Sequence, residues 1–169
     1  MKFSKIRSHA KINMALNTTG RTPYLHKIES IIAFLRLHDE ILIKKSKFKD
    51  HKIIFKGKFS KSIAKRNTVS NLLNLLEEKK FLINQKFEIR INKRIPTRAG
   101  LGGGSMNAAN IFKYLVDKKF IKIKKRKIVE ICNLIGSDVI LGFNSKNSIL
   151  TSKNQIKYFK NCKKFYTLV

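Results

Sequence analysis

One segment decides the fold of this chain: RIPTRAGLGGGSMNAAN, residues 94–110. Four of the eight glycines in the 169-residue sequence lie between positions 100 and 104, after an alternating apolar run and before a helix-like one. Glycine has no Cβ atom, so the backbone can approach an anion closely, and the N–H groups and positive dipole end of a following helix attract that anion. The order strand, Gly-rich loop, helix therefore predicts a phosphate-binding loop.

The glycine spacing matches neither of two common phosphate-loop patterns. No Lys-Ser or Lys-Thr pair follows the glycines, as a Walker A loop requires, and the spacing is not G-x-G-x-x-G. A flexible connection without a ligand is the alternative, and a single glycine pair would favour it. The run G-L-G-G-G-S at a helix start instead favours phosphate binding.

Apolar periodicity on both sides of this segment predicts helices. Residues 67–82 place Val and Leu on one broad stripe, and Asn67 or Thr68 can serve as the N-cap. Residues 105–119 and 124–136 have the same helical spacing, and the second stretch ends in a glycine.

Strand patterns fill most of the remaining sequence, so the fold class predicted is α+β with a mixed or antiparallel sheet. Residues 86–95 alternate apolar and polar side chains, as a half-buried strand should. Residues 28–37 and 40–48 read as two strands around a tight connection at 38–40. Further strands are expected at the following positions: 3–20, 52–59 with a bend at Gly57, 137–143, 148–152, 155–159 and 164–169.

Composition limits the classes of function. The chain is 43% hydrophobic, which is enough for the core of one domain, or of one domain plus part of another. The net charge of +28 favours polyanions, but 30 of the 38 basic residues are Lys, and they are scattered along the chain. Phosphate recognition tends to use the bidentate Arg fork. We therefore expect non-specific polyanion binding as a side effect and no specific nucleic-acid partner.

The cysteines and the N-terminus point to an ordinary cytoplasmic protein. Cys132 and Cys162 form neither a C-x-x-C pair nor a disulfide framework, and no His pair lies nearby to suggest zinc. The N-terminus lacks the apolar core of a signal peptide, and the longest apolar run, residues 31–35, is too short to span a bilayer. The prediction is a cytoplasmic location without a membrane partner.

Three motifs, in order along the chain, resemble those of the GHMP kinases. They are AKINMALNTTGRTPYLHKIES at 10–30, KRIPTRAGLGGGSMNAAN at 93–110 and IGSDVILGF at 135–143. Within that family, the motifs are most similar to those of members whose phosphoryl acceptor carries a diphosphocytidyl group in isoprenoid synthesis. The resemblance implies a GHMP-kinase N-terminal domain, with the ribosomal-protein-like left-handed βαβ fold and helices packed on one face of a mixed sheet.

The same resemblance implies the domain boundaries. Residues 1–160 would form the ATP-binding domain, and residues 161–169 would begin the strand that leads to a C-terminal domain. Because 164–169 is apolar and strand-like up to the last residue, we expect the chain to stop where a longer relative continues. A separately encoded C-terminal half is one candidate partner.

The resemblance also implies the site. Lys11 and Asp138 would be catalytic, with the carboxylate accepting the proton of the attacking hydroxyl and the ammonium offsetting charge in the transition state. Asn13 and His26 would bind the acceptor, and Asn67 is a candidate contact for adenine. ATP is the expected co-substrate with Mg²⁺, and no metal site of the protein's own is expected. The ATP-binding residues would be Pro96, Thr97, Arg98, Ala99, Gly100, Leu101, Gly102, Gly103, Gly104, Ser105 and Met106.

Other interpretations of these residues stay open at this stage. Asp138 can be a turn or N-cap residue, Lys11 is one of 30 lysines, and Asn13 and His26 can be a strand-edge amide and a surface histidine. The function expected is ATP-dependent phosphorylation of a small-molecule alcohol. The alternatives are a basic RNA- or ribosome-associated module on the same fold and an inactive kinase fragment.

Overall fold

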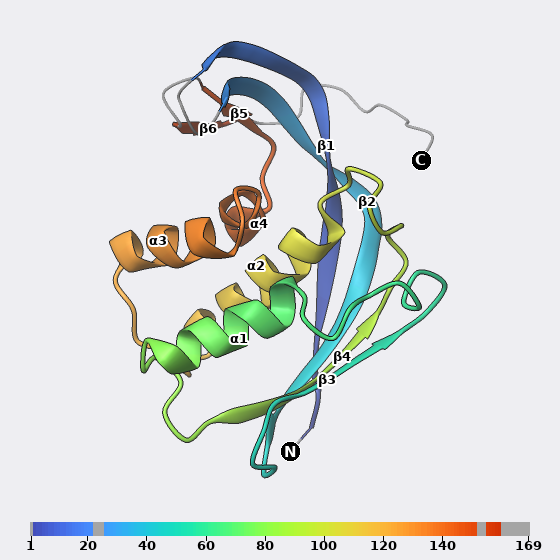
Figure 1. The fold of residues 1–169 in the computed structure, drawn as a ribbon, viewed down its shortest axis with the longest axis vertical. Helices are drawn as coiled ribbons and strands as arrows, with labels where there is room; N and C mark the ends of the chain where they lie inside the picture. The colour runs from blue at the N-terminus through green and yellow to red at the C-terminus, as the bar shows by residue number, and fades with distance from the viewer. Residues whose placement is uncertain (1, 22–25, 152–154, 160–169) are drawn as a thin grey trace.

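The computed structural model describes residues 2–21, 26–151 and 155–159, without the side chains of Arg21, His26 and Lys27. Its element order is β1, β2, β3, α1, β4, α2, α3, α4, β5, β6 (Figure 1). The strand predicted at 164–169 and the boundary predicted at 160/161 lie outside the described residues.

A mixed sheet is built around two long strands. The strands β1 (Ser4–Arg21) and β2 (His26–Ser46) pair antiparallel along nearly their whole length. β4 (Lys86–Asn92) pairs antiparallel with the second half of β2, and β3 (Lys52–Lys56) lies parallel to β4. Near the start of β2, β5 (Ser148–Leu150) pairs with β2 and with β6 (Ile156–Tyr158). The order β3-β4-β2-β5-β6, with β1 on β2, confirms the mixed sheet.

Helices cover one face of this sheet, as expected (Figure 1). They are α1 (Thr68–Glu78), α2 (Gly103–Asp117), α3 (Lys125–Ile135) and α4 (Val139–Asn144). Asn67 caps α1, because its side-chain oxygen accepts the N–H groups of Val69 and Ser70 at 3.0 and 3.2 Å. Since β3 and β4 are parallel neighbours, α1 is the crossover helix of a βαβ unit. The α+β class is therefore confirmed.

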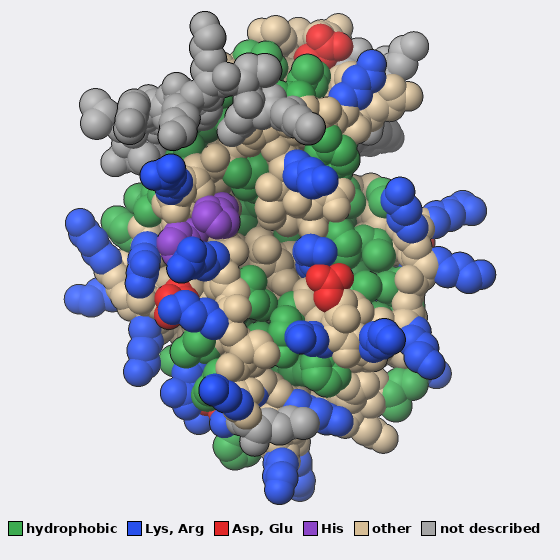
Figure 2. Space-filling model, turned by 180° about the vertical axis from the view of Figure 1, so that it is seen from behind, with side chains coloured by type: hydrophobic (Ala, Val, Ile, Leu, Met, Phe, Trp, Pro, Cys, Tyr) green, Lys and Arg blue, Asp and Glu red, His purple; other side chains and the backbone are tan. Residues whose placement is uncertain are grey.

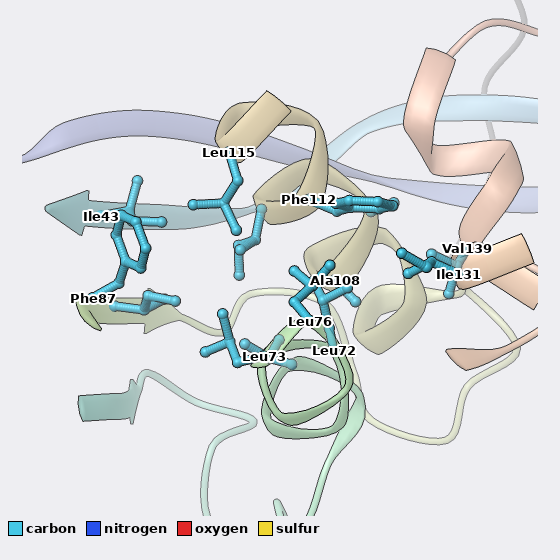
Figure 3. Close-up of a cluster of buried hydrophobic side chains, with 14 of the residues drawn as sticks. Ile43, Leu72, Leu73, Leu76, Phe87, Ala108, Phe112, Leu115, Ile131 and Val139 are labelled. Carbon is cyan, nitrogen blue, oxygen red and sulfur yellow. The ribbon is translucent and has the colours of Figure 1, made fainter. Parts of the chain in front are cut away.

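The main core lies between the sheet and the helices. Phe87 from β4 and Ile43 from β2 meet the leucines of α1 and the inner face of α2, including Phe112 (Figure 3). Ile131 of α3 and Val139 of α4 extend the same cluster. The leucine stripe that predicts α1 is thus the face that fixes this helix on the sheet, and α2 is held next to it.

The tight connection predicted at residues 38–40 is wrong. His38, Asp39 and Glu40 continue β2 without a break, and they pair with His9, Ser8 and Arg7 of β1. Three polar residues in a row resemble a turn, but the Asp39 side chain is fully buried and accepts hydrogen bonds from residues far along the chain. Those donors allow a carboxylate to stay inside the sheet.

The strand predicted at residues 137–143 is also wrong, because α4 occupies most of this stretch. The helix begins where the N–H of Val139 bonds to the carbonyl of Gly136 at 3.0 Å. Gly142 lies against α2, where a Cβ atom at this position would be 2.8 Å from both the Ala109 Cβ and the Met106 Sδ. Close helix packing therefore overrides the strand propensity of the short apolar run.

Candidate active site

The candidate site is a pocket of about 470 Å³ between the Gly-rich loop, the start of α1 and the middle of β1. This volume is within the range of small-molecule sites, which is about 300–1,000 Å³. The walls include an apolar part, with Phe55, Ile63 and Val69, and a polar part, with Lys11, Lys93 and Asp138. The Gly-rich loop separates β4 from α2 and contributes most of the remaining wall.

The missing side chain of Gly102 lets the loop backbone lie close to the side chain of Lys11. Gly102 has a φ of +67°, a conformation that glycine adopts easily, and it occupies the N-cap position of α2. A Cβ atom there would lie 2.9 Å from Cγ and 3.0 Å from Cε of Lys11. Because a glycine is the N-cap, no capping side chain covers the first turn of α2, and its N–H groups stay available to an anion.

Further hydrogen bonds hold the Gly-rich loop on neighbouring elements. The backbone N–H of Lys11 donates to the carbonyl of Leu101 at 3.0 Å, so β1 is tied to the loop. The Thr68 hydroxyl donates to the carbonyl of Gly104 at 2.9 Å, which joins α1 to α2. These bonds tie the loop to β1, which carries Lys11 and Asn13, and the start of α2 to the start of α1.

Lys11 and Asp138 meet inside this pocket. The Lys11 Nζ lies 3.0 Å from Asp138 Oδ2 and donates a hydrogen bond to Asn13 Oδ1 at 2.8 Å. The lysine side chain is 8% exposed and the aspartate 35%, so the ammonium is nearly enclosed while the carboxylate can still be reached. Asp138 stands in the N-cap position of α4, but its side chain makes no capping bond there. The carboxylate is therefore directed to Lys11 and the pocket rather than used to start the helix.

The residues predicted to bind ATP line the pocket with one exception. Pro96 through Ser105 all belong to its wall, and Arg98 adopts a φ of +60°. The side chain of Met106 is instead fully buried and packs with Ile32 and Leu141. Asn13 reaches the site through Lys11. His26 begins β2, but its side chain is outside the described structure.

The side chain of Asn67, a candidate contact for adenine, forms hydrogen bonds to the backbone around the start of α1. Its side-chain oxygen caps α1, and its side-chain nitrogen donates to the carbonyls of Ala64 and Lys65 at 3.1 and 3.2 Å. The residue borders the pocket, but both ends of its amide are committed to the backbone. Its contribution to the site is to fix the start of α1.

Sequence reasoning missed a second, buried polar cluster beside the pocket. Lys93 and Asn107 line the pocket wall, and both bind the carboxylate of Asp39 on β2. Lys93 and Asn107 fall inside the motif at 93–110, but Lys93 is one of many lysines and Asn107 has ordinary helical spacing. The available signal was the acidic pair Asp39 and Glu40 between two apolar stretches, a pattern that also predicts a turn.

The described residues contain neither a cluster of metal ligands nor a helix that could span a membrane. Within residues 2–21, 26–151 and 155–159, no group of three or more His, Cys, Asp or Glu side chains is placed to hold a metal ion. In the same part of the chain, no helix combines the length and apolar character needed to cross a bilayer.

The sequence is similar to that of known kinases. The family described as "GHMP kinases N terminal domain" matches residues 67–147. The chain is 55% identical over its full length to the 4-diphosphocytidyl-2-C-methyl-D-erythritol kinase of Pelagibacter ubique, and it spans 60% of that relative's length. It is 33% identical to the enzyme of the same name from Finegoldia magna, over 86% of the chain and 51% of that relative.

Solved structures share the fold. A crystal structure of 4-(cytidine 5'-diphospho)-2C-methyl-D-erythritol kinase superposes with a TM-score of 0.73 at 21% identity, covering 92% of this chain and 55% of that one. Homoserine kinase from Cytophaga hutchinsonii gives a TM-score of 0.62 at 17% identity, over 95% of this chain and 52% of that one. At these identities the likeness concerns the fold alone.

Proposed function

We propose that this chain is a member of the GHMP kinase family, and that its pocket binds ATP and transfers the γ-phosphoryl group to a small-molecule alcohol. The acceptor proposed is the 2-hydroxyl of 4-diphosphocytidyl-2-C-methyl-D-erythritol, in the non-mevalonate route to isoprenoids. That compound gives the curated relatives from Pelagibacter ubique and Finegoldia magna their names. The observation that carries the proposal is the Lys11–Asp138 pair, 3.0 Å apart in the pocket that the Gly-rich loop lines.

The loop would hold the phosphates of ATP. The N–H groups at the start of α2 and the glycines before them offer donors and an unobstructed approach, and the stem of Lys11 lies against Gly102. Arg98, on the same wall, can add a second cation for a phosphate oxygen. Phe55 and Ile63 give the pocket an apolar end, which suits a purine base.

Asp138 would accept the proton of the attacking hydroxyl. As the acceptor oxygen forms its bond to the γ-phosphorus, the bond between that phosphorus and the β,γ-bridging oxygen breaks, and ADP leaves. The hydroxyl proton passes to a carboxylate oxygen of Asp138. Lys11 holds that carboxylate in place and stabilises negative charge on the phosphoryl oxygens, while Asn13 orients the lysine.

Mg²⁺ would accompany ATP rather than occupy a site of the protein's own. Magnesium is commonly bound by substrate phosphates, waters and one or two protein oxygens, and Ser105 and Asp138 offer such oxygens on the pocket wall. Bound there, it would neutralise part of the phosphate charge.

The proposed function also involves the part of the relatives that this chain does not match. The chain spans 60% and 51% of the lengths of the two curated relatives. We propose that residues 1–160 form the ATP-binding domain, and that a C-terminal region, joined to the chain or supplied separately, completes the acceptor site. Asn13 and His26 would then be the contribution of β1 and β2 to acceptor binding.

The test combines calorimetry with an assay of product. The protein should bind Mg-ATP at one site, and with a C-terminal region of a relative added, it should convert the acceptor to a phosphorylated product and ADP. A protein that binds no Mg-ATP, and gives no product under conditions where an intact relative does, would rule out the kinase.

Figure 2 shows Lys and Arg distributed over the visible face without a single stripe, so RNA binding should be weak and strongly salt-dependent. Tight binding of RNA in place of ATP would favour the RNA-associated module instead.

A further inference from the structure

The carboxylate of Asp39 connects the two ends of the Gly-rich loop, although this residue lies outside the three sequence motifs. Its Oδ1 accepts the backbone N–H groups of Arg94 and Ile95 at 2.8 and 2.9 Å, directly after β4. Its Oδ2 accepts the side-chain amide of Asn107 on α2 at 2.9 Å, and it also binds the ammonium of Lys93. A single fully buried side chain on β2 thus binds the chain before the loop and the helix after it.

The cluster lies immediately beside the backbone of the first turn of α2. A Cβ atom on Gly103, in the first turn of α2, would be 3.1 Å from the Lys93 Nζ and 3.0 Å from Cγ2 of Ile95. Lys93 is 3% exposed and also belongs to the pocket wall. A shift of the Asp39 network would therefore move the backbone that carries the N–H groups of the loop.

We propose that Asp39 is the positioning residue of the Gly-rich loop, fixing the distance between the end of β4 and the start of α2 so that the loop can hold an anion. The identity of that anion, the phosphates of Mg-ATP, rests on the proposed function. Asp39 touches neither ATP nor the acceptor in this account, and it acts through the backbone of Arg94 and Ile95 and through Asn107.

The alternative is that Asp39 and Lys93 form a buried ion pair with only a stabilising role. Buried pairs of that kind can often be replaced by neutral residues at little cost, provided that both partners are replaced. The two roles differ because an ion pair needs only charge, whereas positioning needs acceptors for the two backbone N–H groups and the Asn107 amide. The side-chain oxygen of Asn107 is buried without a partner, so this amide can reverse and accept a hydrogen bond if Asp39 becomes an amide.

Two double variants separate the roles in the same uncharged background. Asp39→Asn/Lys93→Met removes both charges but keeps an oxygen for the N–H groups of Arg94 and Ile95, and its new amide can donate to the reversed Asn107. Asp39→Ala/Lys93→Met removes the charges and the acceptors together. Asp117→Asn is the control, because it removes an exposed carboxylate, paired with Lys113, from the far end of the same helix α2.

Amide hydrogen exchange gives a readout that does not depend on ATP. In the unaltered protein and in Asp39→Asn/Lys93→Met, the amides of Arg94 and Ile95 should be protected. In Asp39→Ala/Lys93→Met, their protection should fall by at least about tenfold, the effect of losing one hydrogen bond to a buried partner. Asp117→Asn should match the unaltered protein. Unprotected Arg94 and Ile95 amides in the unaltered protein would overturn the proposal, even if the Ala variant does not fold.

Calorimetry with Mg-ATP adds the functional readout. The dissociation constant of Asp39→Ala/Lys93→Met should exceed that of Asp39→Asn/Lys93→Met by at least about tenfold, the effect of losing one hydrogen bond to a charged phosphate. Equal affinities and equal amide protection in two folded double variants would reduce Asp39 to a member of an ion pair. If the unaltered protein binds no Mg-ATP, the proposed function fails, while amide exchange still decides the role of Asp39.

Discussion

The ammonium of Lys11 on β1 lies 3.0 Å from the carboxylate of Asp138, at the start of α4. The Gly-rich loop is attached to the same lysine, because the Lys11 N–H bonds to the Leu101 carbonyl and the lysine stem lies against Gly102. Lys11 therefore contacts both the loop and the carboxylate, so a change that displaces this lysine should affect both.

The contact between Gly102 and Lys11 predicts unequal effects of two similar substitutions. Gly100 and Gly102 both have positive φ, so alanine should cost each about 1 kcal/mol of stability. Only Gly102→Ala places a Cβ atom against Lys11, whereas a Cβ on Gly100 would meet nothing within 4 Å. Gly102→Ala should therefore weaken Mg-ATP binding and turnover much more than Gly100→Ala, as measured by calorimetry and product formation. Equal losses in the two variants would show that the lysine does not depend on this contact.

Replacing Gly142 by alanine should destabilise the protein, although the same change within a helix usually stabilises it. In the middle of a helix, Gly→Ala normally stabilises by up to about 1 kcal/mol. Here the new Cβ would lie 2.8 Å from atoms of Ala109 and Met106, and overpacking of that kind typically costs about 1–3 kcal/mol. Gly142→Ala should lower the free energy of unfolding in urea, whereas Asn133→Ala on the exposed surface of α3 should change it little. A more stable Gly142→Ala protein would contradict the packing of α4 on α2.

His51 predicts a loss of stability in mild acid. Burial lowers the pKa of this imidazole below its ordinary value of 6.5, against the opposing effect of the Glu77 and Asp50 carboxylates and with a smaller contribution from Lys86. The imidazole of the unfolded chain therefore binds a proton more readily than that of the folded protein. The contribution of His51 to stability is complete above its ordinary pKa, and it is lost as the pH falls from there toward the lower pKa of the folded protein. Urea unfolding at about pH 7 and about pH 5 should show this decrease.

The matched variant for His51 keeps its hydrogen bond and removes its titration. His51 Nδ1 accepts the N–H of Phe87 at 3.0 Å, and the side-chain oxygen of asparagine can take its place. His51→Asn should therefore lose less stability than the unaltered protein over the same pH interval. Identical pH dependence in the two proteins would assign the acid sensitivity to other groups.

Cys132 should resist alkylation in the folded protein. Its side chain is fully buried in the core, and burial raises the pKa of the thiol to about 12, so almost no thiolate exists near pH 8. Treatment with iodoacetamide followed by peptide mass spectrometry should find this residue unmodified in buffer and modified in urea. Rapid labelling in buffer would show that α3 does not bury Cys132 in the core, contrary to the structure.

The lining of the candidate site was largely predictable because its strongest signals are local. The run of glycines predicts a loop, and the three motifs single out Lys11 and Asp138 among many lysines and a few acidic residues. What the residues alone could not supply was the distance between those two side chains. That distance depends on α4 packing against α2, and a short apolar run gives no periodicity that distinguishes a helix from a strand.

Asp39 shows the other limit of sequence reasoning. A polar triplet between two apolar stretches is usually a turn, and nothing near residues 38–40 reveals that donors from residues 93–95 and 107 will surround the carboxylate. The fold brings those donors together only after β4 pairs with β2 and α2 packs on the sheet. Long-range hydrogen bonding thus decided both the continuity of β2 and the placing of the loop.

The most direct test of the account is Asp138→Asn, measured for both Mg-ATP affinity and turnover, with Asp117→Asn as the surface control. The amide keeps the shape of the carboxylate but is a poor proton acceptor, so turnover should fall by at least about a hundredfold, a typical contribution of a general base. The dissociation constant for Mg-ATP should stay within about threefold, because the Gly-rich loop is untouched. An Asp138→Asn protein that turns over at the unaltered rate would contradict the claim that this loop and the Lys11–Asp138 pair form a phosphoryl-transfer site.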